Sequence, residues 1–93
     1  MNPDTEVEMQ NQYTNRMIKN LKKLRESAGL TQEKLGVKLG VSRQTISTIE
    51  TRNCSLTWSL YLAMVCVFQQ YDDSKALLEK LKLFDSGFIK ENL

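Results

Sequence analysis

Twenty residues near the middle of the chain, TQEKLGVKLGVSRQTISTIE (31–50), constrain the fold more than any other stretch. Their apolar positions have helical spacing on both sides of a single break at Gly40. Glycine readily takes the left-handed conformation that ends a helix. The stretch therefore predicts two short helices joined by a tight turn, with five apolar residues facing inward: Leu35, Leu39, Val41, Ile46 and Ile49.

Residues at the ends of the two expected helices support this reading. Thr31 is a suitable N-cap for the first helix, and Glu33 lies in its first turn, where the helix dipole favours negative charge. Ser42 is a suitable cap for the second. With Val41 folded under the corner, the two helices make a helix-turn-helix. Gly36 lies inside the first helix, where it indicates either a close approach to the second helix or simple tolerance of a glycine.

The second helix, 42–50, has an outward face suited to reading DNA. Its inward side consists of Ile46 and Ile49. Between Gln44 and Ile49 the helix carries no acidic residue, whereas a helix that merely faces water more often carries Glu and Lys. Arginine pairs with guanine, glutamine with adenine, and serine and threonine with several bases in the major groove. We therefore expect five side chains to contact bases: Arg43, Gln44, Thr45, Ser47 and Thr48.

The run LKKLRESAGLTQEKLGVKLGVSRQTISTIE resembles the DNA-binding domain of phage repressors and Cro, the XRE-type helix-turn-helix family. The resemblance covers about 18–68, and it is specific because RESAGLTQEKL, LGVS and TISTIE occur together, in order and at the family's spacing. It implies an all-α, compact five-helix repressor-like domain. The chain departs from the family after Glu50, where TRNCS replaces a longer loop with Gly and Pro, so the loop contacts are left open.

The resemblance also implies roles for individual residues. Arg25 matches the family position that forms an ion pair with the acid ending the recognition helix, here Glu50; the alternative is an exposed Arg and an unrelated Glu. Gln32 matches the position that contacts the DNA backbone and braces the first Arg or Gln of the second helix. Further contacts with the DNA backbone are expected from three residues: Lys22, Arg52 and Asn53.

The net charge of +2 hides a strong asymmetry along the chain. Residues 1–15 carry three acids and no Lys or Arg, whereas 16–52 carry nine basic residues and three acids. Residues 53–93 have four basic residues and five acids. Positive charge that coincides with a helix-turn-helix is the electrostatic pattern of a nucleic-acid surface.

Length and periodicity divide the chain into three parts. Residues 1–14 are expected to be a flexible acidic N-terminal arm, 15–70 the DNA-binding domain, and 71–93 a C-terminal helix and tail. Helices are expected at about 15–28, 57–69 and 73–84, with the last one capped by Asp72, Asp73 or Ser74 and stopped by Gly87. Excess apolar residues in helix 57–69, the last helix and the tail favour a homodimer over a tail packed on its own core. They include Leu77, Leu78, Leu81, Phe84, Phe88, Ile89 and Leu93.

Composition argues against several classes of protein. The chain has no histidine, and its two cysteines, Cys54 and Cys66, lack the spacing of a zinc site, so no metal and no cofactor are expected. Cys66 is expected to be a small core residue and Cys54 to lie in a loop. The absence of a glycine-rich phosphate loop and of paired acids argues against an enzyme. No apolar run has the length of a membrane span and no secretory signal is evident, which favours a cytoplasmic protein with no membrane contact.

These observations predict a small transcriptional regulator that binds double-stranded DNA. A homodimer would present two recognition helices about 34 Å apart and would select a pseudo-palindromic operator. By analogy with the family, repression is the commoner outcome. The alternative is an antitoxin-type or other protein-interaction module, in which the acidic arm or the tail holds a small protein partner.

Overall fold

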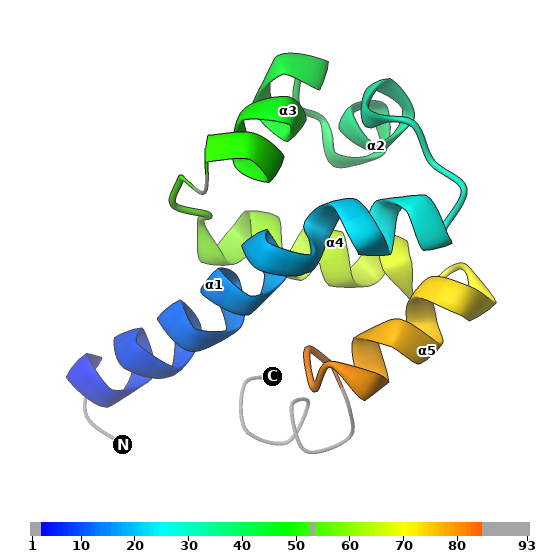
Figure 1. Ribbon diagram of the computed structural model, residues 1–93. Helices are drawn as coiled ribbons and strands as arrows, with labels where there is room; N and C mark the ends of the chain where they lie inside the picture. The colour runs from blue at the N-terminus through cyan, green and yellow to red at the C-terminus, as the bar shows by residue number, and fades with distance from the viewer. Residues whose placement is uncertain (1–2, 53, 85–93) are drawn as a thin grey trace.

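The structure, a computed structural model, describes residues 3–52 and 54–84 and contains five helices in that part of the chain, with no strand there. The prediction of an all-α, five-helix domain is confirmed. Figure 1 shows the helices, whose bounds are α1 (Pro3–Ser27), α2 (Gln32–Leu39), α3 (Arg43–Arg52), α4 (Trp58–Phe68) and α5 (Asp72–Lys80).

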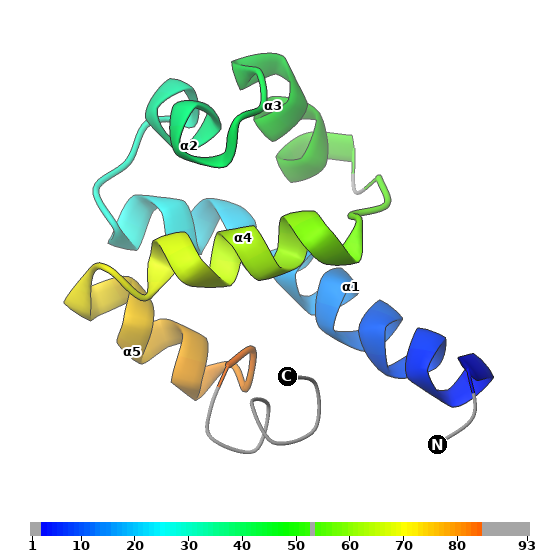
Figure 2. The ribbon, with the colours of Figure 1, turned by 180° about the vertical axis from the view of Figure 1, so that it is seen from behind.

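The helices are arranged around a central crossing of α1 and α4. The pair α2–α3 lies on one side of this crossing and α5 on the other, as the opposite views in Figures 1 and 2 both show. Helix α1 contacts α3, α4 and α5, while α4 contacts α2 and α5. The two central helices therefore hold the α2–α3 pair in place from below.

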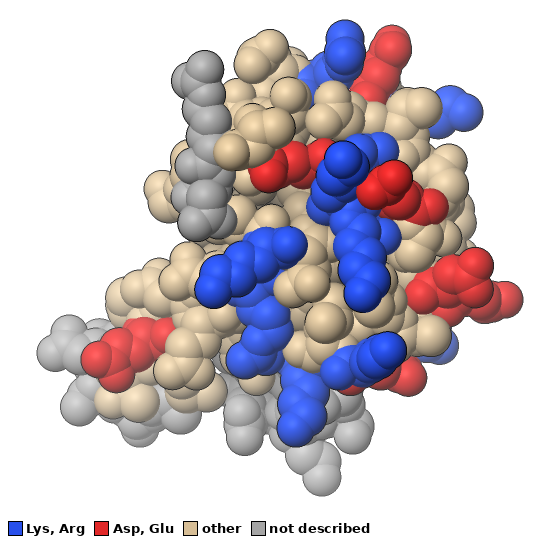
Figure 3. Space-filling view, viewed as in Figure 1, with Lys and Arg blue, Asp and Glu red and all other residues tan. Residues whose placement is uncertain are grey.

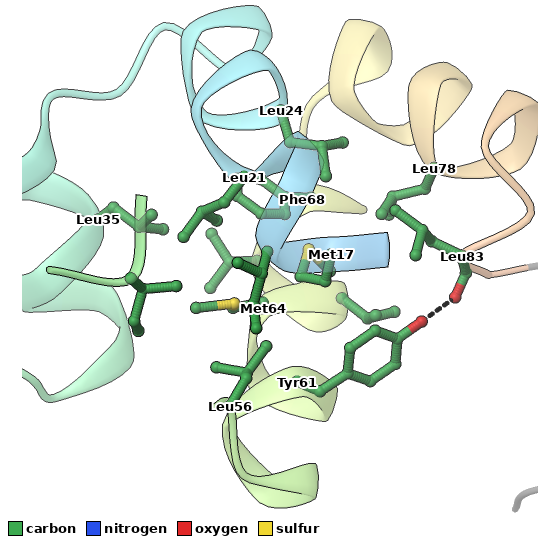
Figure 4. Packing of buried hydrophobic residues seen from close by; sticks show 14 of the residues in the cluster. Met17, Leu21, Leu24, Leu35, Leu56, Tyr61, Met64, Phe68, Leu78 and Leu83 are labelled. Atoms are coloured by element: carbon green, nitrogen blue, oxygen red, sulfur yellow. Dashed lines mark hydrogen bonds between the residues drawn. The ribbon is translucent and has the colours of Figure 1, made fainter. Parts of the chain in front are cut away.

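A single hydrophobic core fills the space between the five helices (Figure 4). Helix α1 contributes Met17, Ile18, Leu21 and Leu24. The remaining core comes from every other helix and from the connections between them. Its other buried members are Leu30, Leu35, Ile46, Ile49, Leu56, Tyr61, Met64, Val65, Val67, Phe68, Leu78 and Leu83.

Helix α1 begins earlier than the sequence indicated. A start near Asn15 was expected, but the helix runs without interruption from Pro3 to Ser27. Proline fits the first turn of a helix because its fixed φ is helical and it lacks only an N–H that would have no partner there. Acids such as Glu6 are favoured near the positive end of the helix dipole. The first turns extend away from the other helices in both ribbon views, and Val7 on them is 53% exposed.

Helix α4 forms close to its expected position. Thr57 is its N-cap, and its hydroxyl accepts a hydrogen bond of 3.2 Å from the Leu60 N–H. The prediction that Cys66 is a core residue is wrong, because its side chain is exposed. Apolar residues surround this helix on nearly every side, so hydropathy alone could not identify the side that faces out. No helix in the described part of the chain has both the length and the apolar character needed to cross a bilayer.

Helix α5 differs from its prediction at both ends. Tyr71 occupies the N-cap position, whereas Asp72, Asp73 or Ser74 was expected there. Ser74 is instead fully buried and donates to the Phe68 carbonyl at 2.5 Å. The helix ends at Lys80, before Phe84, and the turn that follows contains Lys82 at φ +58°. The stop at Gly87 and the apolar tail residues Phe88, Ile89 and Leu93 lie outside the described residues.

Two side chains attach the end of α5 to the central helices. The Arg16 guanidinium on α1 donates to the carbonyls of Leu81 and Lys82, at 3.4 and 3.2 Å. The buried Tyr61 hydroxyl on α4 donates to the Leu83 carbonyl (Figure 4). Burial raises the pKa of Tyr61, and nearby Tyr13 raises it further, while Arg16 acts in the opposite direction.

Trp58 and Tyr61 belong to the aromatic packing of this region. Their rings stack with centroids 4.8 Å apart and an interplanar angle of 4°. The Tyr13 ring on α1 lies against both of them, with centroids 6.2 and 6.0 Å away. The three rings therefore pack α1 against α4.

Candidate nucleic-acid interface

The turn between α2 and α3 is built from backbone hydrogen bonds around Gly40. Gly40 has φ +74°, a left-handed conformation that glycine adopts without steric cost. The Val41 N–H donates to the Gly36 carbonyl at 2.9 Å, and the Gly40 N–H donates to the Val37 carbonyl at 3.3 Å. This pair of bonds is the Schellman motif, which ends α2 within a single residue.

Both expected N-caps of the helix-turn-helix form. The Thr31 hydroxyl accepts from the Lys34 N–H at 3.1 Å at the start of α2. The Ser42 hydroxyl accepts from the Thr45 N–H, also at 3.1 Å, at the start of α3. The caps fix the first turn of each helix, which is the part of a helix-turn-helix that lies nearest to DNA.

Gly36 allows α2 to touch the backbone of the turn. A Cβ at this position would lie 2.7 Å from the Val41 carbonyl oxygen and 3.4 Å from the Arg43 nitrogen. Side-chain Cβ atoms do not approach a backbone oxygen so closely. Of the two readings of Gly36, close approach is confirmed, and the contact is with the turn and the first residue of α3.

The inward side of α3 fixes which of its residues face out. Ile46 is 0% exposed and Ile49 is 4% exposed, and both belong to the hydrophobic core. Their position three residues apart anchors one face of the helix. Arg43 and Gln44 are consequently exposed, while the rest of the expected reading face is partly exposed: Thr45, Ser47 and Thr48.

Hydrogen bonds link several of these outward side chains. The Gln44 amide nitrogen, Nε2, donates to the Thr48 hydroxyl oxygen one turn later, at 3.3 Å. The hydroxyl groups of Ser42 and Thr45 lie 3.0 Å apart. The body of the protein leaves Gln44 exposed, so its amide is accessible from outside.

Glu50 is the centre of a network at the other end of α3. Arg25 Nε donates to one of its carboxylate oxygens at 2.7 Å, and Arg25 Nη2 donates to the other at 3.2 Å. The side chains of Arg25 and Glu50 are 12% and 3% exposed. The hydrogen bond to Glu50 raises the pKa of Arg25. The ion pair that the family resemblance implied is therefore present in the structure, with bidentate geometry.

Gln32 joins the same network. Its amide nitrogen donates to the Glu50 carboxylate at 3.2 Å, and Arg25 Nη1 donates to the Leu30 carbonyl at 2.9 Å. The resemblance implied a brace between Gln32 and the first Arg or Gln of α3, whereas the structure gives it a bond to the last acid of that helix. Sequence reasoning placed Gln32 at the right end of α2 but not with this partner.

The residues expected to hold the DNA backbone lie on different elements. Lys22 is exposed on α1, beside the exposed Lys19 and Lys23. Arg52 is the last residue of α3, and Asn53 lies outside the described residues. In Figure 3, Lys and Arg side chains gather over the middle of the face that α1 presents to the viewer.

An open hollow of about 350 Å³ borders the outward face of α3, a feature that sequence reasoning missed. Gln44 and Thr48 line one side of it, and Leu60 and Thr57 from the start of α4 line the other. Ile49 and Cys54 also line it. No sequence signal could have revealed it, because it depends on the distance between α3 and α4.

The described residues give no sign of a metal centre. Nowhere in 3–52 or 54–84 do three or more His, Cys, Asp or Glu side chains gather as they would around an ion. Cys54 and Cys66 both carry free thiols.

Comparison with known proteins supports the helix-turn-helix reading. The model of a family described as a helix-turn-helix domain matches residues 19–78, well over half of the chain. The matched region includes α2, α3 and α4, together with most of α5 and the last turns of α1. No curated protein and no solved structure matches the chain.

Proposed function

The chain belongs to the helix-turn-helix domain family, and from that premise we propose that it is a small transcriptional regulator that binds double-stranded DNA at specific sequences. One observation carries the proposal above the others. The outward face of α3 presents neutral and cationic polar side chains, with Arg43 and Gln44 exposed, while Ile46 and Ile49 fix the helix from behind.

In this proposal α3 enters the major groove. Arginine and glutamine can each make bidentate contacts with a base, to guanine and adenine respectively, whereas short hydroxyl side chains make single contacts. Direct contacts with bases come from α3, through Arg43, Gln44, Thr45, Ser47 and Thr48. The DNA backbone is held by Lys22, Gln32, Arg52 and Asn53, which supply affinity and register but read no sequence.

The finer features follow the resemblance to XRE-type repressors and Cro. A homodimer would place two copies of α3 about 34 Å apart, one turn of B-DNA, and would bind a pseudo-palindromic operator. The C-terminal part of the chain, from residue 71 onward, and part of α4 would form the dimer interface. Binding at an operator would most simply repress transcription by competing with RNA polymerase.

Selection of bound sites from random double-stranded DNA tests the function and the dimer together. We expect enrichment of a short inverted repeat whose half-sites lie about one helical turn apart. Enrichment of a single half-site would support sequence-specific DNA recognition but contradict the homodimer. Failure to enrich any sequence, with purified protein at low salt, would contradict sequence-specific binding.

One observation favours a second candidate function, a module that binds a small protein. The first turns of α1 extend beyond the body of the protein and carry Glu6, Glu8 and the exposed Val7. Many domains with this motif combine DNA binding with a protein partner. Copurification of one small protein in stoichiometric amount, lost when residues 1–8 are deleted, would support this candidate; a tagged full chain that purifies alone would count against it.

A further inference from the structure

We propose that Thr48 acts as a positioning residue that orients the Gln44 amide to read adenine, so that α3 recognises an A·T pair through a two-residue unit. The inference rests on the proposed DNA-binding function and deepens it. It starts from the hydrogen bond of 3.3 Å between Gln44 Nε2 and Thr48 Oγ1.

In the structure the amide nitrogen of Gln44 faces Thr48. Gln44 and Thr48 are four residues apart on α3, so their side chains lie one above the other on the same face. Because Nε2 is turned toward Thr48, the carbonyl oxygen Oε1 is turned away from it. Without such a partner, an exposed glutamine side chain samples many rotamers, and ordering them on binding lowers affinity.

The remaining groups of the amide match adenine. An amide nitrogen carries two hydrogens, and one is enough for the bond to Thr48. Adenine presents an N7 acceptor and an N6 donor in the major groove, which pair with the second amide hydrogen and with Oε1. Guanine presents two acceptors there, N7 and O6, and an amide with one fixed carbonyl would place an acceptor against O6.

The surroundings leave this pair accessible to a base. Gln44 is exposed, and the hollow of about 350 Å³ that Gln44 and Thr48 border opens a space beside them. The caps and the two buried isoleucines hold the helix backbone, so the amide is the part of the unit that must be ordered. Ordering by one side-chain hydrogen bond is therefore a direct contribution to specificity.

The test uses the DNA site selected by the wild-type protein and a set of matched threonine variants. Each base pair of the site is changed in turn, and binding of Gln44→Ala identifies the pair that Gln44 reads. Thr48→Val keeps the shape of the side chain and removes the acceptor, while Thr48→Ser keeps the acceptor. Thr51→Val is the control on the same helix, because the Thr51 hydroxyl bonds to the Ser47 carbonyl and not to Gln44.

We expect the pair read by Gln44 to be A·T. Thr48→Val should weaken binding to the adenine site about two- to fivefold, the equivalent of one modest hydrogen bond, and Thr48→Ser, which keeps the hydroxyl, should recover most of that loss. In a Gln44→Ala background the Thr48→Val change should cost clearly less than it does in the wild type, because the part of the loss that acts through the Gln44 amide is already gone. Replacing the adenine by 7-deazaadenine, which lacks the N7 acceptor, should weaken wild type about fivefold and leave Gln44→Ala unaffected.

Several outcomes would overturn the inference. The first is that the base pair whose recognition depends on Gln44 is not A·T. The second is that Thr48→Val and Thr48→Ser lose equal affinity. The third is that Thr48→Val loses as much affinity in the Gln44→Ala background as in the wild type. The experiment with 7-deazaadenine uses the wild-type protein, so its result does not depend on how well a variant folds. Failure of wild type to select any site would instead contradict the proposed function, so the two failures are distinguishable.

Discussion

At the scale of single residues, the Glu50 carboxylate is the point at which side chains from two other helices meet. Its carboxylate accepts two hydrogen bonds from Arg25 and one from Gln32, and its side chain is 3% exposed. A buried carboxylate is stable only when it is paired and hydrogen-bonded. Glu50 therefore joins the ends of α1, α2 and α3 at one point.

Replacing Glu50 with Gln should destabilise the protein by about 3 kcal/mol, because Arg25 would keep its charge in a nearly buried position without a partner. Urea unfolding followed by circular dichroism measures the change. The matched control is Glu79→Gln on the exposed surface of α5, where we expect a change within about 0.5 kcal/mol. Equal effects of the two substitutions would contradict a structural role for the pair.

Replacing Gln44 with Ala should weaken binding to the selected site by about 1–3 kcal/mol, the discrimination that one bidentate contact supplies. Affinity for random DNA rests on phosphate contacts and should fall much less. Fluorescence anisotropy with specific and random probes measures both quantities. An equal loss on the two probes would remove Gln44 from the set of base readers.

Much of the site could be predicted at this scale, since its signals are local in sequence. Thr31, Ser42 and Gly40 act within four residues of themselves, as caps and as a turn. The partner of Gln32 could not be predicted, because it depends on how three helix ends meet. The same holds for the bond from Tyr61 to Leu83, which joins residues 22 positions apart.

At the scale of helices, the contact between α2 and the turn fixes the angle between α2 and α3. The contact is made by Gly36 and by backbone atoms of Val41 and Arg43, so it does not depend on side-chain rotamers. The hydrogen bond from the Val41 N–H to the Gly36 carbonyl ties the same two points together. Backbone atoms on both sides of the turn therefore hold the two helices at this angle.

Replacing Gly36 with Ala should destabilise the domain by about 1–2 kcal/mol. Alanine is the better helix former by about 1 kcal/mol, but its Cβ would lie 2.7 Å from the Val41 carbonyl oxygen, and backbone displacement of this kind typically costs more. Thermal unfolding measures the net effect. Val37→Ala, at the neighbouring 78% exposed position, is the control and should be close to neutral. A stabilised Gly36→Ala variant would show that the turn adjusts.

Helix boundaries could be predicted where apolar periodicity was strong, and their prediction failed where the periodicity was weak. The first fourteen residues are polar, and no stripe marks them as helical, although α1 begins at Pro3. In α4 apolar residues occur on nearly every side of the helix, so the sequence did not indicate which side is exposed. The exposure of Cys66 was missed for this reason. At α5, Asp72 and Ser74 had the chemistry of caps, but Ser74 turns inward to bond Phe68.

At the scale of the whole molecule, the basic surface of α1 and the reading face of α3 lie on one continuous body. Helix α1 supports α3 through the core and through Arg25. Its exposed lysines include Lys22, while α5 lies on the far side of the α1–α4 crossing. The fold class was predictable at this scale from helical periodicity, but the packing order of the helices was not.

Replacing Lys22 with Ala should reduce the salt dependence of DNA binding by about one unit of slope, because one phosphate contact and its released counterion would be lost. Titrations at four or more salt concentrations give the slope. Lys75→Ala on α5 is the control, since Lys75 is exposed on the helix that lies farthest from α2 and α3. An unchanged slope for Lys22→Ala would place that lysine away from the DNA.

The attachment of α5 to the central helices should be sensitive to alkaline pH. Burial raises the pKa of Tyr61 above the ordinary tyrosine value of about 10, so the folded state retains its proton while the unfolded state loses it. The free energy of unfolding should therefore be steady below about pH 10 and fall as the pH rises further. Tyr61→Phe should be about 1 kcal/mol less stable near neutral pH, through loss of the bond to Leu83. The two stability curves should converge above pH 10, and curves that stay parallel would contradict this account.

The residues that hold α3 in the fold are different from those that project from it, so the two sets can be substituted separately. Ile46, Ile49 and Glu50 hold the helix, while Arg43 and Gln44 project from it without entering the core. Substitutions at the projecting positions can therefore accumulate with little loss of stability. Under the proposed function, a lineage carrying this domain is free to acquire a new target sequence in a few mutational steps, and the same freedom makes α3 a practical place to engineer altered binding preferences.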